Sequence, residues 1–128
     1  MTREIKIPGP EHPITVKPTP GRVVVGVNGV IIADTTAALT LQESTYPAVQ
    51  YVPLADVKPE LLQRTETSTY CPFKGNASYY SLTLPDGELT DVIWTYEQPH
   101  EAVSVIAGHA AFYTDRVEMV VIDEVGAQ

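Results

Sequence analysis

The stretch Arg22-Val23-Val24-Val25-Gly26-Val27-Asn28-Gly29-Val30-Ile31-Ile32-Ala33 decides the fold class of this chain. It consists of two runs of mostly β-branched residues that flank the dipeptide Asn28-Gly29. Valine and isoleucine favour extended backbone, and Asn-Gly accepts the two positive φ angles of a type I′ turn. The stretch therefore predicts a β-hairpin in which Val23–Val27 pairs antiparallel with Val30–Ala33.

The rest of the chain repeats this pattern of short apolar runs separated by turn-forming residues. Its 11 prolines lie mostly between the apolar runs, and proline is poorly tolerated inside helices and central strands. A short helix is expected at 56–62, with Asp56 as its cap, and another at 101–106. Further strands are expected at 14–17, 37–42, 48–52, 68–71, 77–84, 91–96, 110–113 and 117–122, although 37–39 is also compatible with helix. The last two of these strands are expected to pair around the turn 114–116.

Many closely spaced strands with only two brief helices predict a mainly β protein. The candidates are a compact antiparallel two-sheet sandwich, a barrel or a β-tent, rather than a parallel sheet with crossover helices. A chain of 128 residues is expected to form a single domain. Its core is expected at about 13–122, after an extended lead-in at 1–12 and before a tail at 123–128.

The charge of the chain argues against two classes of partner. Sixteen acidic residues against eight lysines and arginines give a net charge of −8, and the basic residues are scattered singly. Such a chain is expected to bind neither nucleic acid nor an anionic membrane. The aliphatic runs are too short to span a bilayer, and residues 1–8 lack the apolar segment of a secretory signal, so a cytoplasmic location is expected.

The sequence also argues against a bound metal or cofactor. Cys71 is the only cysteine, which excludes an internal disulfide and a cysteine-rich zinc site. The three histidines, His12, His100 and His109, do not have the spacing of a metal-binding motif. We therefore expect no metal and no cofactor.

The segment 70–80, Tyr-Cys-Pro-Phe-Lys-Gly-Asn-Ala-Ser-Tyr-Tyr, is the strongest candidate for a functional site. Lys74 follows a tight turn, so its ammonium group can fold back toward Cys71 and favour a reactive thiolate. The alternative is an inert, buried Cys71. Lys74 precedes Gly75, where backbone can approach a ligand closely, so it is either a group that grips a carboxylate or phosphate or a solvated turn residue.

The same segment resembles the hallmark of the domain of unknown function 427 family. The resemblance rests on Tyr70-Cys71-Pro72-Phe73-Lys74-Gly75 followed by Ala77-Ser78-Tyr79-Tyr80, and on segments that follow the family's order across 13–117: Gly21-Arg22-Val23, Ala33-Asp34-Thr35, Gln42-Glu43, Tyr51-Val52-Pro53, Trp94-Thr95-Tyr96 and Ala110-Ala111-Phe112-Tyr113. It implies a compact β fold of two antiparallel sheets pinched together like a tent. The family's nucleotidyltransferase-like label implies paired carboxylates and a phosphate-binding loop, and this sequence shows neither motif.

The resemblance and the strand pattern add further candidate site residues. The alternation around Glu43 fits a solvent-facing position, whereas the resemblance implies an inward carboxylate paired with Arg22, Lys74 or a tyrosine hydroxyl. Because neighbouring residues of a strand face opposite sides, Trp94 and Tyr96 should share one face, whereas one of Tyr79 and Tyr80 should be core and the other should line a pocket. The candidate ligand-binding residues are Arg22, Tyr70, Tyr79, Tyr80, Trp94, Tyr96 and His109, although His109 also fits an ordinary surface position.

Three functions are compatible with these residues. The preferred one is a small-molecule-binding domain, in which aromatic side chains form a cleft and Lys74 and Glu43 orient the ligand. The second is an enzyme that uses Cys71 as a nucleophile or redox thiol activated by Lys74, with Glu43 or His109 moving protons. The third is a structural interaction domain with an exposed apolar patch. We expect one pocket to contain or border Cys71, Lys74, Glu43 and Trp94. The expected partner is an unidentified small molecule. The sequence is also compatible with a homodimer.

Overall fold

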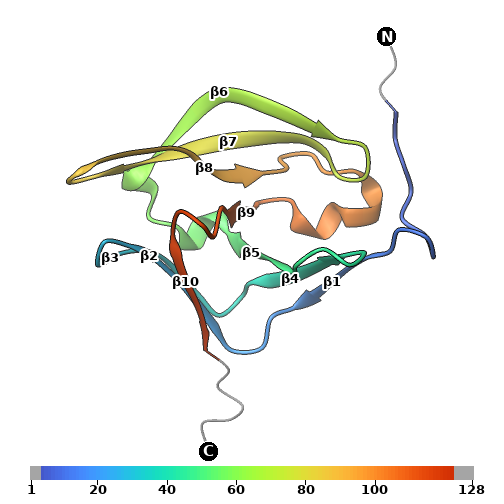
Figure 1. Ribbon diagram of the computed structural model, residues 1–128, viewed down its shortest axis with the longest axis horizontal. Coiled ribbons are helices and arrows are strands. Elements are labelled where there is room, and N and C mark those ends of the chain that lie inside the picture. Colours follow the sequence, from blue (N-terminus) through green and yellow to red (C-terminus); the bar gives the residue numbers. More distant parts are fainter. Residues whose placement is uncertain (1–3, 123–128) are drawn as a thin grey trace, which may run out of the picture.

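The computed structural model describes residues 4–122, which form strands and short 3-10 helices. In chain order the elements are β1 (Ile14–Pro18), β2 (Arg22–Val27), β3 (Val30–Thr35), β4 (Leu39–Glu43), β5 (Val49–Pro53), η1 (Leu54–Asp56), η2 (Pro59–Leu61), β6 (Leu62–Cys71), β7 (Gly75–Leu84), β8 (Gly87–Thr95), η3 (Glu101–Ile106), β9 (His109–Phe112) and β10 (Glu118–Ile122). The strands form two antiparallel sheets, ordered β1-β4-β5-β9-β8-β7-β6 and β10-β2-β3 (Figure 1). The predicted mainly β, two-sheet fold is confirmed, while the predicted tail at 123–128 lies outside the described residues.

The hairpin predicted from the opening stretch is confirmed. β2 pairs antiparallel with β3, and the register ends with Val27 opposite Val30. Asn28 has a φ of 49° and Gly29 a φ of 81°, so both turn residues have the positive φ that a type I′ turn requires. A register shift after Val25 adds a bulge, which increases the local twist of the small sheet.

The prediction that the last two strands pair with each other is wrong. β9 lies inside the large sheet between β5 and β8, whereas β10 pairs with β2, with Glu118 opposite Gly26 and Ile122 opposite Arg22. Val23 and Val25 of β2 are fully buried, and a buried strand needs hydrogen-bond partners along both edges. The chain therefore crosses from one sheet to the other between β9 and β10.

The helix predicted at 56–62 is replaced by the two 3-10 turns η1 and η2. Lys58 precedes a proline, which disfavours helical backbone at that position, and it is extended, with φ −63° and ψ 110°. Asp56 does not cap a helix; its carboxylate accepts a hydrogen bond from Thr35 Oγ1 at 2.7 Å. The predicted second helix is η3, a 3-10 segment interrupted at Val103 by non-helical backbone.

Two strands are longer than the sequence suggested. β6 begins at Leu62 rather than Ser68, and β8 begins at Gly87 rather than Asp91. β6 is an edge strand of the large sheet, and most of its side chains are polar and exposed. Its first half therefore lacks the apolar alternation that marks a half-buried strand.

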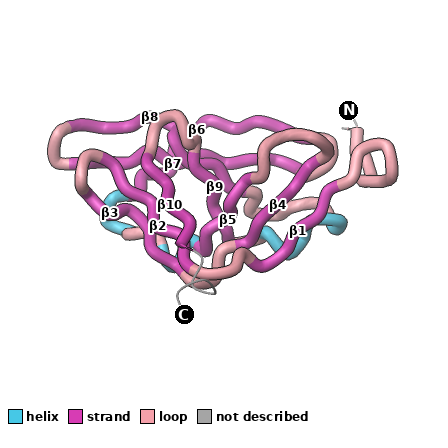
Figure 2. Tube along the Cα trace, turned by 60° about the horizontal axis from the view of Figure 1, so that its bottom comes forward, coloured by secondary structure: helices cyan, strands magenta, loops and turns pink. Residues whose placement is uncertain are grey.

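The central strands of the large sheet separate two apolar clusters. Neighbouring residues of a strand face opposite sides, so Val52 of β5 packs in the first cluster and Tyr51 in the second. The first cluster fills the space against the small sheet, with Val23 and Ile32 among its members. The second lies on the other face and includes Leu41 of β4 and Ile106 of η3. Figure 2 shows the small sheet and the β1–β4 pair at opposite ends of the molecule.

Within the described residues, no helix has the length and apolar character that crossing a membrane requires.

Candidate functional site

A cavity of about 560 Å³ lies beside the second apolar cluster, and most of its wall is aromatic. β5 supplies Tyr51, β7 supplies Tyr79 and β8 supplies Trp94, while the remaining aromatic residues lie in or next to other strands. Five tyrosines take part in the lining. The aromatic residues that line the cavity are Tyr46, Tyr51, Tyr79, Trp94, Tyr96, Phe112 and Tyr113.

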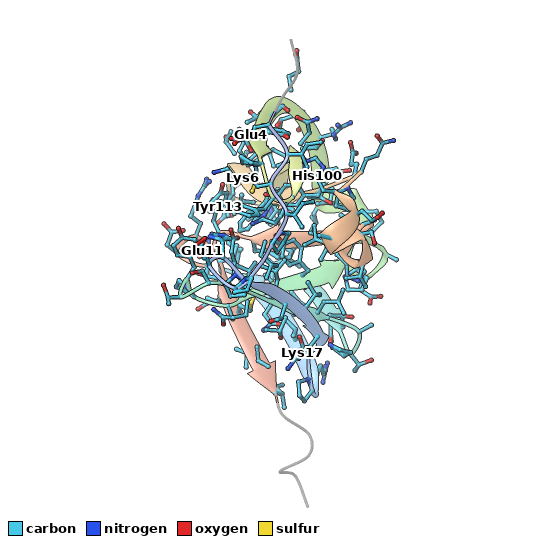
Figure 3. The ribbon with its side chains drawn as sticks, turned by 90° about the vertical axis from the view of Figure 1, so that its right-hand side faces the viewer. Glu4, Lys6, Glu11, Lys17, His100 and Tyr113 are labelled. Carbon is cyan, nitrogen blue, oxygen red and sulfur yellow. The ribbon has the colours of Figure 1, made fainter. Side chains whose placement is uncertain are left out.

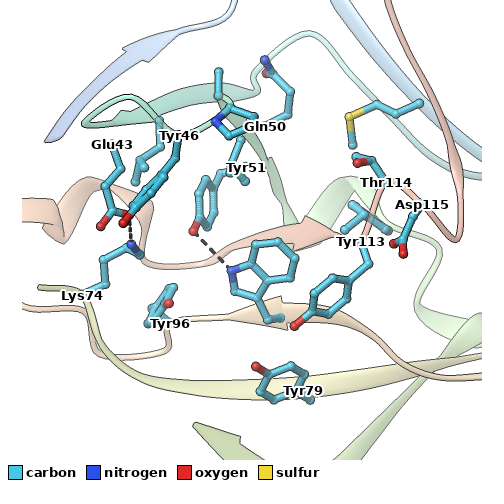
Figure 4. A pocket seen from close by; sticks show the side chains of 17 residues that line it. Glu43, Tyr46, Gln50, Tyr51, Lys74, Tyr79, Tyr96, Tyr113, Thr114 and Asp115 are labelled. Carbon is cyan, nitrogen blue, oxygen red and sulfur yellow. Dashed lines mark hydrogen bonds and ion pairs between the residues drawn. The ribbon is translucent and has the colours of Figure 1, made fainter. Parts of the chain in front are cut away.

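One end of the cavity holds an ion pair between Lys74 and Glu43 (Figure 4). The Glu43 carboxylate also accepts a hydrogen bond from His12, with 2.7 Å between His12 Nε2 and Glu43 Oε2. Both charged side chains are mostly buried, with 10% of Lys74 and 15% of Glu43 exposed. Burial alone would raise the pKa of Glu43, but the Lys74 and His12 hydrogen bonds outweigh it and hold this pKa below its ordinary value. The carboxyl is therefore ionised at neutral pH.

The turn between β6 and β7 positions Lys74. The Lys74 N–H donates to the Cys71 carbonyl at 3.2 Å, and the Lys74 carbonyl accepts from the His100 N–H at 2.9 Å. Gly75 follows with a φ of 111°, and a Cβ there would lie 3.4 Å from the Gln98 carbonyl oxygen. Only glycine fits this backbone without strain. The turn conformation that Gly75 permits places the Lys74 side chain next to Glu43 of β4.

The lead-in before β1 packs against the same turn (Figure 3). The Lys6 N–H donates to the Pro72 carbonyl at 2.9 Å, and Gly9 and His12 form a local backbone bridge. The His12 ring stacks on Phe73, with 4.1 Å between the ring centroids and 9° between the planes. These contacts hold His12 against Glu43, so the lead-in contributes a side chain to this end of the site.

Tyrosine side chains surround the middle of the cavity. The Trp94 indole N–H donates to Tyr51 Oη at 3.3 Å, and the Trp94 and Tyr113 ring centroids are 4.7 Å apart. Burial raises the pKa of Tyr51 to about 12, opposed in part by the Trp94 hydrogen bond. Burial, followed by interaction with Tyr79, raises the pKa of Tyr113 to about 12, and burial also raises the pKa of Tyr96. These phenols are therefore neutral at physiological pH.

The opposite end of the cavity is formed by the segment between the two sheets. Figure 4 shows Thr114 and Asp115 across the cavity from Glu43 and Lys74. Among residues 4–122, no hydrogen bond or ion pair engages the Asp115 carboxylate. Its neighbour Arg116 donates to the Thr90 carbonyl at 2.7 Å and does not line the cavity.

The structure brings together five of the residues singled out from the sequence. Glu43, Lys74, Tyr79, Trp94 and Tyr96 all line the cavity. Trp94 and Tyr96 share a face as expected. The two neighbouring tyrosines lie on opposite faces as expected, because Tyr79 lines the cavity and Tyr80 packs against the first apolar cluster.

The other predicted site residues lie elsewhere. Tyr80 packs against the first apolar cluster, and Cys71 is half-buried beside the second without lining the cavity. Arg22 is on the small sheet and forms a two-point ion pair with Asp34, not with Glu43. Tyr70 donates to the Glu4 carbonyl and lies 3.3 Å from His100 Nε2, while His109 Nδ1 contacts the Ala107 carbonyl at 3.0 Å.

Several residues of this site were not selected from the sequence. Tyr51 belongs to Tyr51-Val52-Pro53, one of the segments that resemble the family, so the resemblance could have indicated it. His12, in the lead-in, and Asp115, in the segment between the sheets, gave no local signal because their positions depend on long-range packing. Within residues 4–122, no group of three or more histidine, cysteine or acidic residues is arranged to hold a metal ion.

The fold and the cavity define a mainly β domain with an aromatic pocket. A family model described as domain of unknown function (DUF427) matches residues 15–123, and the chain belongs to this family. The match confirms the resemblance carried by the Tyr70–Tyr80 segment. No curated protein matches the sequence.

Proposed function

We propose that this protein binds a small organic molecule in the aromatic cavity. The observation that carries the proposal is the convergence of five tyrosines and the single tryptophan on one cavity of about 560 Å³. Small-molecule sites are typically concave, mostly apolar, roughly 300–1,000 Å³ in volume, and carry a few placed polar groups. This cavity has that composition, with Glu43 and Lys74 at one end and Asp115 at the other.

The rigidity of the wall supports binding. Trp94 is hydrogen-bonded to Tyr51, and Tyr79 is hydrogen-bonded to Thr69 with 2.9 Å between the two hydroxyl oxygens. Side chains held by such bonds lose little conformational entropy when a ligand arrives. A ligand would therefore meet aromatic faces that are already in place.

A cysteine-based enzyme has less support than a binding domain. Cys71 does not line the cavity, and the Lys74 ammonium is engaged by Glu43. An activated thiol needs both a nearby positive charge and access to substrate. The binding function needs only the aromatic cavity.

The test is a screen of chemically diverse small molecules, including neutral, anionic and cationic ones, read by the fluorescence of Trp94. Because Trp94 is the only tryptophan and lines the cavity, the signal reports on this site alone. We expect hits that change the fluorescence in a saturable manner. Ala48 is exposed and lines the cavity, so Ala48→Phe should fill the entrance and abolish the response.

The matched control is Ala102→Phe, an exposed alanine in η3 that does not line the cavity. This variant should bind every hit as the unmodified protein does. The proposal would be rejected if no compound changed the Trp94 signal. It would also be rejected if Ala48→Phe and the unmodified protein bound the hits equally well.

A further inference from the structure

Two of the charged side chains that line the cavity form an ion pair with each other, and a third does not take part in one within residues 4–122. Within the described residues the charged lining consists of Glu43, Lys74 and Asp115. Glu43 and Lys74 neutralise each other in a mostly buried ion pair. Asp115, at the other end, has no such partner. The lining therefore carries one uncompensated negative charge.

An anionic ligand is poorly suited to this cavity. The only basic group it would meet in the described lining is the Lys74 ammonium, which is already paired. Drawing Lys74 away would leave the Glu43 carboxylate mostly buried with His12 as its remaining partner, and breaking a buried ion pair is costly. The net charge of −8 on the whole chain acts in the same direction.

A ligand rich in hydroxyl groups would compete with hydrogen bonds that the wall already makes. Several polar side chains of the wall already have partners: Trp94 bonds to Tyr51, Tyr79 to Thr69, and Lys74 to Glu43. A sugar-like ligand needs unpaired donors and acceptors, because burying its hydroxyls without partners is unfavourable. Aromatic faces make up most of what the wall offers to a ligand.

A mostly aromatic wall with a carboxylate at one end, unpaired among the described residues, suits a positive charge that needs no hydrogen bonds. The faces of tryptophan and tyrosine attract cations held within about 6 Å of the ring centre. Trp94 and Tyr113 form a contiguous aromatic surface, with their rings tilted by 50°, and Asp115 lies two residues beyond Tyr113. A quaternary ammonium group carries charge and apolar methyls but has no N–H to satisfy.

The geometry points to an organic cation with a quaternary or fully methylated ammonium group as the ligand class of this cavity. The ammonium group lies against Trp94 and Tyr113, and the Asp115 carboxylate balances its charge. The Glu43–Lys74 pair closes the opposite end. This inference rests on the proposed function, because it names the chemistry of the molecule that the cavity binds.

The test compares two ligands of the same shape. Choline and 3,3-dimethylbutan-1-ol differ only in that a quaternary nitrogen replaces a quaternary carbon. Binding is followed by the amide and indole N–H resonances in a two-dimensional NMR spectrum, with the Trp94 indole signal as the local reporter. We expect choline to shift this signal saturably and the neutral alcohol to bind roughly tenfold more weakly. Tetramethylammonium should shift the same resonance, and benzoate should not.

Two pairs of variants locate the cation. Asp115→Asn should weaken choline binding several-fold and leave the neutral alcohol unchanged, whereas Glu60→Gln, an exposed acid in η2 outside the cavity, should bind choline normally. Tyr113→Leu should weaken choline binding, and Tyr113→Phe should retain it, because the ring and not the hydroxyl faces the cation.

The outcomes separate this inference from the proposed function. If the neutral alcohol or benzoate shifts the Trp94 resonance at least as strongly as choline, the cation inference is overturned and the cavity remains a binding site. If choline binds but Asp115→Asn has no effect, the assigned geometry is wrong. If neither these probes nor the broad screen changes Trp94, both proposals fail.

Discussion

Lys74 and Glu43, 31 positions apart in the chain, form an ion pair at one end of the aromatic cavity. The pair depends on two separate pieces of structure, since the β6–β7 turn presents the lysine and the end of β4 presents the carboxylate. His12, contributed by the lead-in, bonds the second carboxylate oxygen. A single carboxylate thereby ties together three distant segments.

Lys74→Met should destabilise the protein by about 2 kcal/mol, because it leaves the mostly buried Glu43 carboxylate without its cation. Urea denaturation measures the loss. Lys58→Met, at an exposed lysine that forms no ion pair within residues 4–122, is the control and should change the free energy of unfolding by less than about 0.5 kcal/mol. Adding Glu43→Leu to Lys74→Met should recover part of the loss, and further destabilisation by the double change would contradict this account.

The stabilisation from Glu43 should disappear in acid. Its pKa is lowered in the folded protein, so its contribution is present above the ordinary value of 4.5 and is lost as the pH falls through the lower, folded value. The difference in free energy of unfolding between the unmodified protein and Glu43→Gln should therefore shrink below pH 4.5. Asp34 and Asp91 also have lowered pKa values, but both proteins retain them, so their effects cancel in the difference. A difference that grew in acid would refute the assignment.

Three tyrosines of the cavity wall, Tyr51, Tyr96 and Tyr113, should ionise at a higher pH than an ordinary tyrosine. Burial raises the pKa of Tyr51 to about 12, and burial with the Tyr79 interaction raises that of Tyr113 to about 12. Phenolate absorbance should therefore stay incomplete between pH 10 and 12 in the folded protein and be complete there in urea. Because the unfolded chain loses these protons first, stability should fall as the pH rises through this window. Titration of all seven tyrosines near pH 10 in the folded state would contradict the buried placement.

Gly75→Ala should cost about 2 kcal/mol, because a φ of 111° strains any residue with a Cβ. The resulting shift of the turn should also displace Lys74 from Glu43. Thermal unfolding monitored by circular dichroism measures the loss. Gly9→Ala, which meets no atom within 4 Å and has no positive φ, should leave the melting temperature nearly unchanged.

Cys71 should react slowly with iodoacetamide at neutral pH in the folded protein and rapidly in urea. The thiol is half-buried, packs against the second apolar cluster and lies outside the cavity lining. Mass spectrometry of the alkylated chain follows the reaction. Equal rates in the folded and unfolded states would indicate an exposed thiol and would revive the cysteine-based enzyme.

The sequence predicted those structural features that neighbouring residues determine, and it missed those that depend on distant parts of the chain. The Asn28-Gly29 hairpin was predictable because the turn chemistry and the flanking valines act within one short stretch. The common face of Trp94 and Tyr96 followed from strand alternation alone. The pairing of β10 with β2 was missed, since nothing near Val117–Ile122 shows that a distant, buried strand needs a partner.

The same distinction between local and long-range causes holds for the residues of the candidate site. Glu43 was selected through the family resemblance and not from its own surroundings, which read as an ordinary polar and apolar alternation. The position of His12 depends on the lead-in packing on Phe73, and that of Asp115 depends on the crossing between sheets. Both arrangements are tertiary, so no local pattern could have indicated them.

The pairing of β10 with β2 also bears on how the chain is made. The β2–β3 hairpin leaves the ribosome early, but the strand that covers the other edge of β2 is synthesised long afterwards. During that interval the hairpin presents an open, valine-rich edge of the kind that recruits strands from other molecules. Shielding of the nascent chain should thus matter until Ile122 has emerged, and premature termination within Glu118–Ile122 should give aggregates instead of a shortened, working protein.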